Sequence, residues 1–154
     1  MLAGMPMIDL TYPADAISAD QRQTLVDELT TALLRAERAP DTEFFRSITW
    51  VFVHELPAGN ILAAGKPVSA PIVRVEVTTP EGALSDRRRA ELVEAATKVV
   101  RETFAIAEDQ TLQRVWVTCR EIVEGSWGAG GQIVHFAQLR EMAAAARAEE
   151  GAAV

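Results

Sequence analysis

The sequence contains little cysteine and little histidine. Its 154 residues include one cysteine, Cys119, which excludes an internal disulfide framework and is typical of a reducing compartment. The two histidines and this cysteine show no spacing typical of zinc ligands, so we expect no metal. No apolar run approaches the roughly 18 residues of a membrane span, and the first residues lack the pattern of a secretion signal. We therefore expect a cytoplasmic protein without a membrane segment.

Positive charge is also scarce. Fifteen Lys and Arg against 22 Asp and Glu give a net charge of −7, whereas phosphate binding needs a basic surface, so nucleic acid is not an expected partner. The one basic cluster, residues 87–89, opens a stretch that also carries glutamates and is typical of a solvated helix face. A small organic anion remains possible as a ligand, because one well-placed arginine outweighs distant net charge.

The sequence does contain a repeat. Pro6 and Pro71 each open a run in which apolar and polar residues alternate. Each run is followed by a loop, a helix begun by serine, a β-branched strand and a glycine turn. The turn glycines, Gly59 and Gly125, lie 53 and 54 residues beyond their prolines. This spacing is typical of a duplicated β-α-β unit.

Each copy predicts a strand, a helix and a second strand. Alternation and β-branched residues predict strands over residues 7–12, 48–54, 73–78 and 112–120. Apolar stripes behind serine N-caps predict helices over residues 18–38 and from residue 85 onward, and an alanine-rich stretch predicts a third over residues 136–150. Residues 65–70 are expected to link the copies, and residues 125–131 to form a glycine-rich hairpin.

These elements predict an α+β fold. A helix that joins two strands makes them parallel through a right-handed crossover, so two copies side by side give a four-stranded sheet with both helices on one face. The bulky residues expected on the opposite face are Tyr12, Trp50, Phe52 and Trp116. That face needs a cover, and self-association supplies one. The expected organisation is one domain over residues 6–135, made of repeats 6–65 and 71–131, and a C-terminal helix or tail over residues 136–154.

These patterns resemble the tautomerase superfamily, whose founding member is 4-oxalocrotonate tautomerase. The second copy is similar to it in the strand after Pro71, the helix start at Ser85 and the glycine hairpin of residues 125–131. The turn over residues 57–60 and Trp116 resemble the fused, double-length branch that includes cis-3-chloroacrylic acid dehalogenase. The resemblance covers roughly residues 6–135.

The resemblance implies a MIF-like fold, a homotrimer, no cofactor, and chemistry at an amino-terminal proline. A secondary amine whose pKa is lowered towards neutrality is a general base near pH 7 and moves a proton within an enol or 2-keto acid. Pro6 is then the catalytic residue, provided that it begins the mature chain. Translation from Met5 followed by removal of the methionine would achieve this, and the four residues before Met5 would be a misassigned start. Pro71 cannot carry a free amine and is structural.

The carboxylate-binding arginines that the resemblance implies are replaced in this chain. The family's arginine before the first helix corresponds to Ile17 and Leu84, and its strand arginine to Trp50 and Trp116. The arginine pair, histidine and glutamate of the dehalogenases also lack counterparts, which disfavours dehalogenation of chloroacrylate.

Other residues are candidates for the site. Arg114 is expected on the same strand face as Trp116, and Arg46 precedes the second strand in the first copy, so either is a candidate partner for a substrate carboxylate. Trp127 corresponds to the family's hydrophobic wall residue, and Trp116 is a further candidate contact. His54 and Cys119 are expected to be structural.

Three functions therefore remain open. The leading one is a cofactor-independent tautomerase of a small 2-keto or enol carboxylate with Pro6 as general base and acid. A hydratase, decarboxylase or dehalogenase-like enzyme acting on an unsaturated acid would instead use a protonated Pro6. In a non-catalytic member, Pro6 would be internal, at the start of an edge strand where no amide donor is required.

Overall fold

The two repeats share one four-stranded sheet, in the order β2-β1-β5-β6. The computed structural model describes residues 5–152. In the first repeat the elements are β1 (Met7–Pro13), α1 (Ala19–Glu37), α2 (Glu43–Ser47), β2 (Trp50–Leu56), β3 (Leu62–Ala63) and β4 (Lys66–Pro67). In the second they are β5 (Val73–Pro80), α3 (Asp86–Phe104), the 3-10 turn η1 (Glu108–Gln110), α4 (Thr111–Arg114), β6 (Val115–Ile122), β7 (Gly128–Ala129), β8 (Gln132–Ile133) and α5 (Phe136–Ala152).

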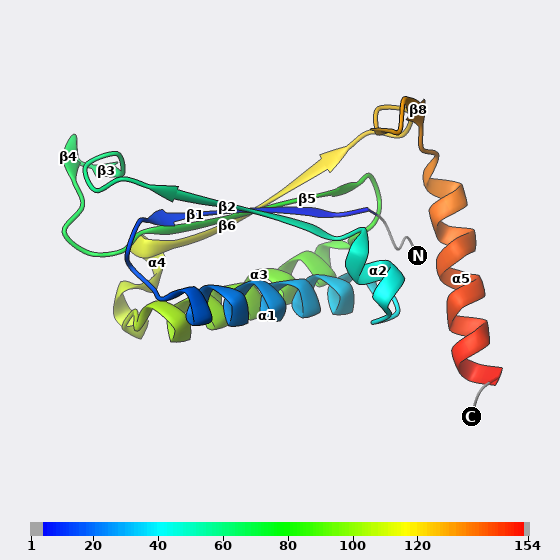
Figure 1. The fold of residues 1–154 in the computed structure, drawn as a ribbon, viewed down its shortest axis with the longest axis horizontal. Coiled ribbons are helices and arrows are strands. Elements are labelled where there is room, and N and C mark those ends of the chain that lie inside the picture. Colours follow the sequence, from blue (N-terminus) through cyan, green and yellow to red (C-terminus); the bar gives the residue numbers. More distant parts are fainter. Residues whose placement is uncertain (1–4, 153–154) are drawn as a thin grey trace.

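The strand directions confirm the predicted crossovers. Strand β1 is parallel to β2 and β5 is parallel to β6, while the repeats meet antiparallel between β1 and β5. Both α1 and α3 lie on one face of the sheet, as Figure 1 shows. The chain therefore has the α+β fold that its repeat predicts.

The main core lies between the sheet and these two helices. Alternate residues of the central strands face the helices, which meet them with leucines and small residues at helical spacing. The fully buried members from the strands are Ile8, Leu10, Tyr12, Val73, Val75 and Val77, and those from the helices include Leu25, Leu29, Leu33, Leu92, Ala96 and Val100. Burying each large apolar side chain contributes roughly 1.5–3 kcal/mol to folding.

The repeat is visible in how the two long helices begin and end. The Ser18 hydroxyl accepts the Gln21 N–H and the Gln21 side chain accepts the Ser18 N–H, while Ser85 caps α3 by accepting the N–H of Arg88. Both helices have 19 residues and end at a residue in the left-handed region, with φ of 53° in each case. Matched caps give the two copies the same length of crossover.

Tyr12 does not lie on the open face of the sheet, so that prediction is wrong. It is fully buried among the core residues, where its ring packs edge-on against Phe104 at 5.2 Å. Its hydroxyl donates to Oε1 of Glu55 at 2.6 Å, a bond that lets a tyrosine be buried without losing its polar partner. Side chains two residues apart on a strand lie on the same face of the sheet, so Tyr12 lies on the helix-covered face with Ile8 and Leu10.

The other bulky residues predicted for the open face do lie there. Trp50, Phe52 and Trp116 are 55%, 47% and 64% exposed on the side without helices. Trp50 and Phe52 pack edge-on with ring centroids 6.3 Å apart. An aromatic surface of this kind is typical of an interface.

Three local predictions are corrected by the structure. Strand β6 begins at Val115, because residues 111–114 form a helical turn in which Val115 N–H donates to the carbonyl of Thr111. Residues 43–47 form the short helix α2, so β2 begins at Trp50. The link between the repeats contains a second hairpin, β3–β4, which matches β7–β8 of the second copy.

Candidate functional site

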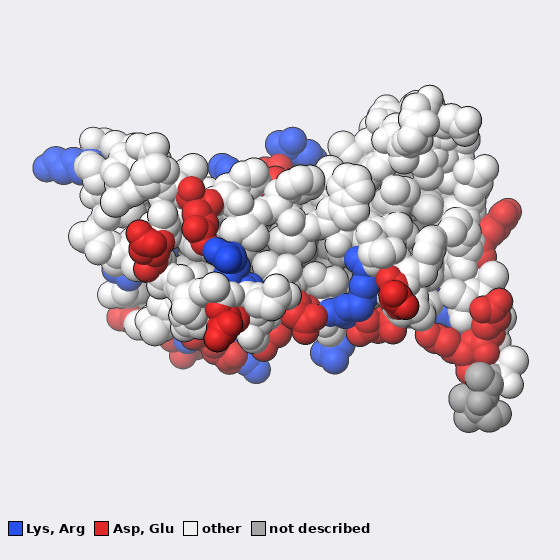
Figure 2. All heavy atoms as spheres, viewed as in Figure 1, with Lys and Arg blue, Asp and Glu red and all other residues white. Residues whose placement is uncertain are grey.

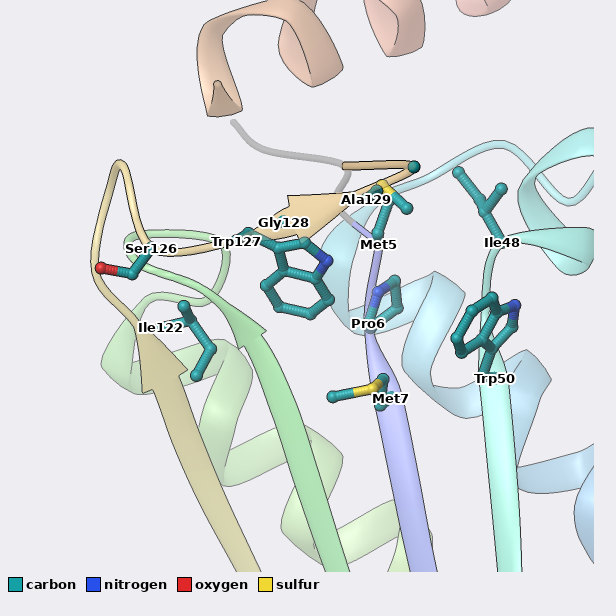
Figure 3. A pocket seen from close by; sticks show the side chains of 11 residues that line it. Met5, Pro6, Met7, Ile48, Trp50, Ile122, Ser126, Trp127, Gly128 and Ala129 are labelled. Atoms are coloured by element: carbon teal, nitrogen blue, oxygen red, sulfur yellow. The ribbon is translucent and has the colours of Figure 1, made fainter. Parts of the chain in front are cut away.

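A cavity of about 550 Å³ opens at the end of the sheet where β1 and β2 begin. Figure 3 shows side chains from three places in the chain around it. The residues that line it are Met5, Pro6, Met7, Ile48, Trp50, Ile122, Ser126, Trp127, Gly128, Ala129 and Gly130. The first repeat thus supplies its floor and one wall, and the hairpin of the second repeat supplies the other wall.

Pro6 is buried at the centre of this cavity. Its ring lies between the indoles of Trp127 and Trp50 (Figure 3). Its carbonyl accepts the backbone N–H of Trp50 at 3.2 Å, which continues the β1–β2 pairing by one residue. With Met5 attached, the Pro6 nitrogen is a tertiary amide and has no basic lone pair. The first four residues, predicted to be a misassigned start, lie outside the described residues.

The cavity is almost entirely apolar. None of the described residues that line it carries a charged side chain, and the hydroxyl of Ser126 and the two indole N–H groups are its side-chain donors. Figure 2 shows the same character at the surface, because acidic and basic side chains gather over the helix layer while the region over β7–β8 is uncharged. Such a site favours neutral over charged groups unless a cation enters from elsewhere.

Arg46 is held away from the cavity by acidic partners. Its guanidinium donates to Asp41 at 2.8 Å and to Asp27 at 2.5 Å, and also to the hydroxyl of Thr31. The hydrogen bond to Asp41, opposed by partial burial and aided by Asp27, raises the pKa of Arg46. These contacts tie α2 to α1, and Arg46 is not among the described residues that line the cavity.

Arg114 and Trp116 lie at the other end of the sheet. The register places Thr78 opposite Met7 and Arg120 beside Thr78, so the Pro6 end of the sheet is the far end of β6. The start of β6, next to Arg114, is roughly 17 Å from Arg120 at about 3.3 Å per residue. Arg114 lines a separate hollow of about 280 Å³ beside the β3–β4 hairpin. Trp116 is also at that end, and its indole donates to the carbonyl of Leu112 at 2.9 Å.

The structure therefore brings Pro6 together with Trp127, but with neither arginine of the same chain. It also brings in Trp50, Ile48 and Ile122, which the sequence did not single out as site residues. The repeat could have drawn attention to Trp50. It lies 66 residues before Trp116, the same spacing that separates Gly59 from Gly125, so Trp50 and Trp116 occupy matching positions in the two copies. Ile122 belongs to the second repeat, and only the fold places it at the same cavity as Pro6 of the first repeat.

His54 and Cys119 have structural environments. His54 Nε2 lies 2.7 Å from Asp9 Oδ1 on the open sheet face. Cys119 packs against the main core, and burial raises the pKa of its thiol, which disfavours the reactive thiolate. Residues 5–152 contain no group of three or more metal-binding side chains, and none of the helices described is long and apolar enough to cross a membrane.

Known families and structures match this architecture. Residues 71–137 match the family model described as "Tautomerase enzyme". The structure of Pt0534 inactivated by 2-oxo-3-pentynoate is 25% identical, with a TM-score of 0.71 over 86% of this chain and 98% of that one. N1, a member of the cis-3-chloroacrylic acid dehalogenase family, is 20% identical, with a TM-score of 0.70 over 88% and 89%. The wild-type fused 4-OT R7, an asymmetric trimer, is 22% identical, with a TM-score of 0.66 over 82% and 94%.

No curated protein matches the chain by sequence at a significant level. The family match falls on the second repeat, whereas the structural matches extend over both repeats. Together with the tandem β-α-β sheet, they confirm the resemblance found in the sequence. The second repeat thus matches the tautomerase family, and the chain as a whole shares the fold of fused, double-length members of the tautomerase superfamily.

Proposed function

We propose that this protein is a cofactor-independent tautomerase of a small enol or 2-keto carboxylate, with Pro6 as the general base and acid. The observation that carries the proposal is the burial of Pro6 between two indoles in an uncharged cavity. Desolvation disfavours an ammonium ion and so lowers the pKa of a buried amine towards neutrality. A free Pro6 nitrogen would then accept a proton from one carbon or oxygen of the substrate and return it to another.

The carboxylate partner in this proposal is Arg114 of a second copy. Within one chain, Arg114 lies at the opposite end of the sheet from Pro6, and Arg46 is paired with Asp27 and Asp41. Fused 4-OT R7 and F6 are trimers, and the aromatic open face of this chain provides a surface for a similar assembly. An arginine entering an apolar cavity would bind a carboxylate strongly, because little water competes there.

Two alternatives are weaker. N1 belongs to a dehalogenase family, but attack by water needs a side chain that activates the water, and no described lining residue is acidic or a histidine. A non-catalytic protein would retain Met5, which would block the Pro6 nitrogen. The cytoplasmic location remains part of the proposal and rests on the single cysteine.

Activity of two forms of the chain tests the role of Pro6. A form that begins at Pro6 should ketonise the enol of phenylpyruvate or 2-hydroxymuconate, whereas the form that begins at Met1 should not. Pro6→Ala should lower the rate by about 100-fold or more, the range expected for a general base. Equal rates in the Pro6-start protein and its Pro6→Ala variant would refute the proposal.

Covalent labelling tests the amine without a natural substrate. Pt0534 is inactivated by 2-oxo-3-pentynoate, an activated alkyne to which a secondary amine adds. Here the Pro6 nitrogen would form a bond to the alkyne and its proton would move to the adjacent carbon, with no leaving group. Intact mass should rise by one reagent, located at Pro6 by peptide mapping. A label on Cys119, or equal labelling of the Met1-start form, would count against the mechanism.

A further inference from the structure

Helix α5 contacts both walls of the Pro6 cavity. Near its start, Phe136 and Leu139 are buried with Ala83, and Met5, Trp127 and Val134 pack against this cluster. One to two turns later, Ala143 is fully buried with Leu34 and Phe45, and Ile48 and Ala146 pack against that second cluster. Trp127 and Ile48 line the cavity on the hairpin side and on the α2 side. Figure 1 shows how one helix reaches both, since α5 lies across the end of the molecule beside α2.

Polar contacts fix α5 at two points. The carboxylate of Glu124, just before the hairpin, accepts the backbone N–H of Phe136 and also bonds to Nδ1 of His135, both at 3.0 Å. Further along α5, Arg147 donates to the carbonyl of Arg38, the C-cap residue of α1, at 3.0 Å. The helix is therefore connected to the hairpin at its start and to the helix layer nearer its end.

The hairpin that carries Trp127 has little rigidity of its own. Gly125, Gly130 and Gly131 have positive φ, and its two strands contain two residues each. The first repeat offers a comparison, since β3–β4 has the same closing bond, Val68 N–H to Ile61 carbonyl, as Val134 N–H to Trp127 carbonyl. No helix follows β3–β4 before β5, and Leu62 there is 55% exposed. The second hairpin is thus distinguished by the helix that packs on it.

We infer that α5 is a brace that holds Trp127 and Ile48 at a set separation across Pro6, and that Leu139 is a positioning residue for the site. The family match ends at residue 137, so nearly all of α5 lies beyond it. The expected effect of the brace on turnover rests on the proposed function. Its expected effect on the orientation of Trp127 does not. A side chain held by packing on a second element keeps its orientation, whereas a tryptophan on a short glycine hairpin would sample several.

Leu139→Ala tests the brace, and Met142→Ala is its matched control on the exposed side of the same helix. Leu139 is 6% exposed and Met142 is 44% exposed. Leu139→Ala should shift Trp127 emission to longer wavelength and increase its quenching by acrylamide, and Leu139→Met should restore both. The Trp127 contribution is isolated by repeating each change in Trp127→Phe. Emission and quenching equal to those of Met142→Ala would overturn the inference.

Turnover gives the second readout. In the Pro6-start protein, Leu139→Ala should lower kcat/KM for phenylpyruvate by about 10-fold, mainly through KM, within the roughly 100-fold that a 1 Å misplacement can produce. A response of Trp127 without any ketonisation, even before mutation, would refute the proposed function and leave the brace supported. Unchanged Trp127 emission with lowered activity would refute the brace alone.

Glu124→Gln is a second test of the brace, for the case in which Leu139→Ala does not fold. The Glu124 side chain is 47% exposed, so its replacement should leave the core intact while weakening the anchor at the start of α5. It should shift Trp127 emission in the same direction by a smaller amount, with an unchanged far-ultraviolet circular dichroism spectrum. A folded Glu124→Gln protein with unaltered Trp127 emission and quenching would contradict the inference.

Discussion

Tyr12, the only tyrosine of the chain, is the one aromatic residue of the core that carries a polar group. Its hydroxyl and Nη1 of Arg22 both donate to Oε1 of Glu55, at 2.6 and 2.9 Å. Burial raises the pKa of Tyr12 to about 12, and the hydrogen bond to Glu55 and its negative charge act in the same direction. The side chain therefore packs as a hydrophobic ring only while it is protonated.

Titration of Tyr12 should show this directly. Because the pKa is about 10 in the unfolded chain and about 12 in the folded one, the folded protein holds the proton more tightly between these values. The contribution to stability is complete below pH 10 and is lost as the pH rises from 10 to 12. Absorbance at the tyrosinate band should rise near pH 12 for the folded protein and near pH 10 in denaturant. A folded midpoint near 10 would contradict the burial described.

Pro6 and Pro71 differ in their position in the chain and in their surroundings. Pro6 is buried in the apolar cavity at the end of the sheet, whereas Pro71 follows the first repeat in the chain and always has its nitrogen in a peptide bond. Both prolines mark the repeat, but a reactive amine is possible only at a chain start. The sequence made Pro6 a candidate, and its burial between two indoles is visible only in the fold.

At the scale of elements, the capping of the two long helices is readily tested. Ser18→Ala and Ser85→Ala should each lower the free energy of unfolding by about 1 kcal/mol, because each removes an acceptor for an N–H at a helix start. Gln21→Ala should cause a further small loss, while Arg88→Ala should not, since Arg88 has no such role at its own cap. Denaturant unfolding measures the differences. A loss for Arg88→Ala equal to that for Gln21→Ala would contradict the capping box.

The anchor of α5 predicts a response to acid. Partial burial opposes ionisation of Glu124, but hydrogen bonds from the Phe136 N–H and from His135 outweigh it, so the pKa of Glu124 lies below its ordinary value. The stabilisation is present above the ordinary glutamate pKa of about 4.3 and is lost as the pH falls through the lowered value. Trp127 emission should change in that acidic range and not in Glu124→Gln. A step of equal size in the variant would assign it to another group.

The sequence predicted the long strands and helices correctly, because their apolar residues repeat at a regular spacing. It failed for short turns, which contain too few residues to show such a pattern. The alternation of Val73, Val75 and Val77 and the stripe along α3 predicted their structures because burial of one face determines them. The turn over residues 111–114 has no such pattern, and it moved Arg114 off the strand on which it was expected. Hairpin β3–β4 was not predicted, because its sequence contains fewer glycines than the hairpin of the second copy. Only the repeat spacing could have indicated it.

At the scale of the whole molecule, the open sheet face should hold copies of the chain together. If the chain forms the proposed trimer through this face, Phe52→Asp should reduce it to monomers, because an unpaired carboxylate within an apolar interface is strongly unfavourable. Leu112→Asp is the control, since Leu112 is 83% exposed on α4, outside the sheet. Light scattering after size exclusion gives the mass. Dissociation by Leu112→Asp alone would place the interface elsewhere.

A mixing experiment tests whether the site is shared between copies. Pro6→Ala and Arg114→Ala, each nearly inactive alone, should regain activity when unfolded and refolded together. A mixed trimer would bring an intact Pro6 from one variant beside an intact Arg114 from the other. No recovery on mixing, with trimers formed, would mean that Arg114 is not the carboxylate partner of a neighbouring Pro6.

The sequence by itself determined the duplication, the two β-α-β crossovers and the placement of both long helices on one face of the sheet, because these follow from periodicity and short crossovers. It also identified Pro6 and Trp127 as candidates for the site. Only the tertiary structure decided that Trp50 and Ile48 join them, that Arg46 and Arg114 of the same chain do not, and that α5 packs behind both walls. These contacts join residues far apart in sequence, and they depend on how the second hairpin and the last helix fold back over the end of the sheet.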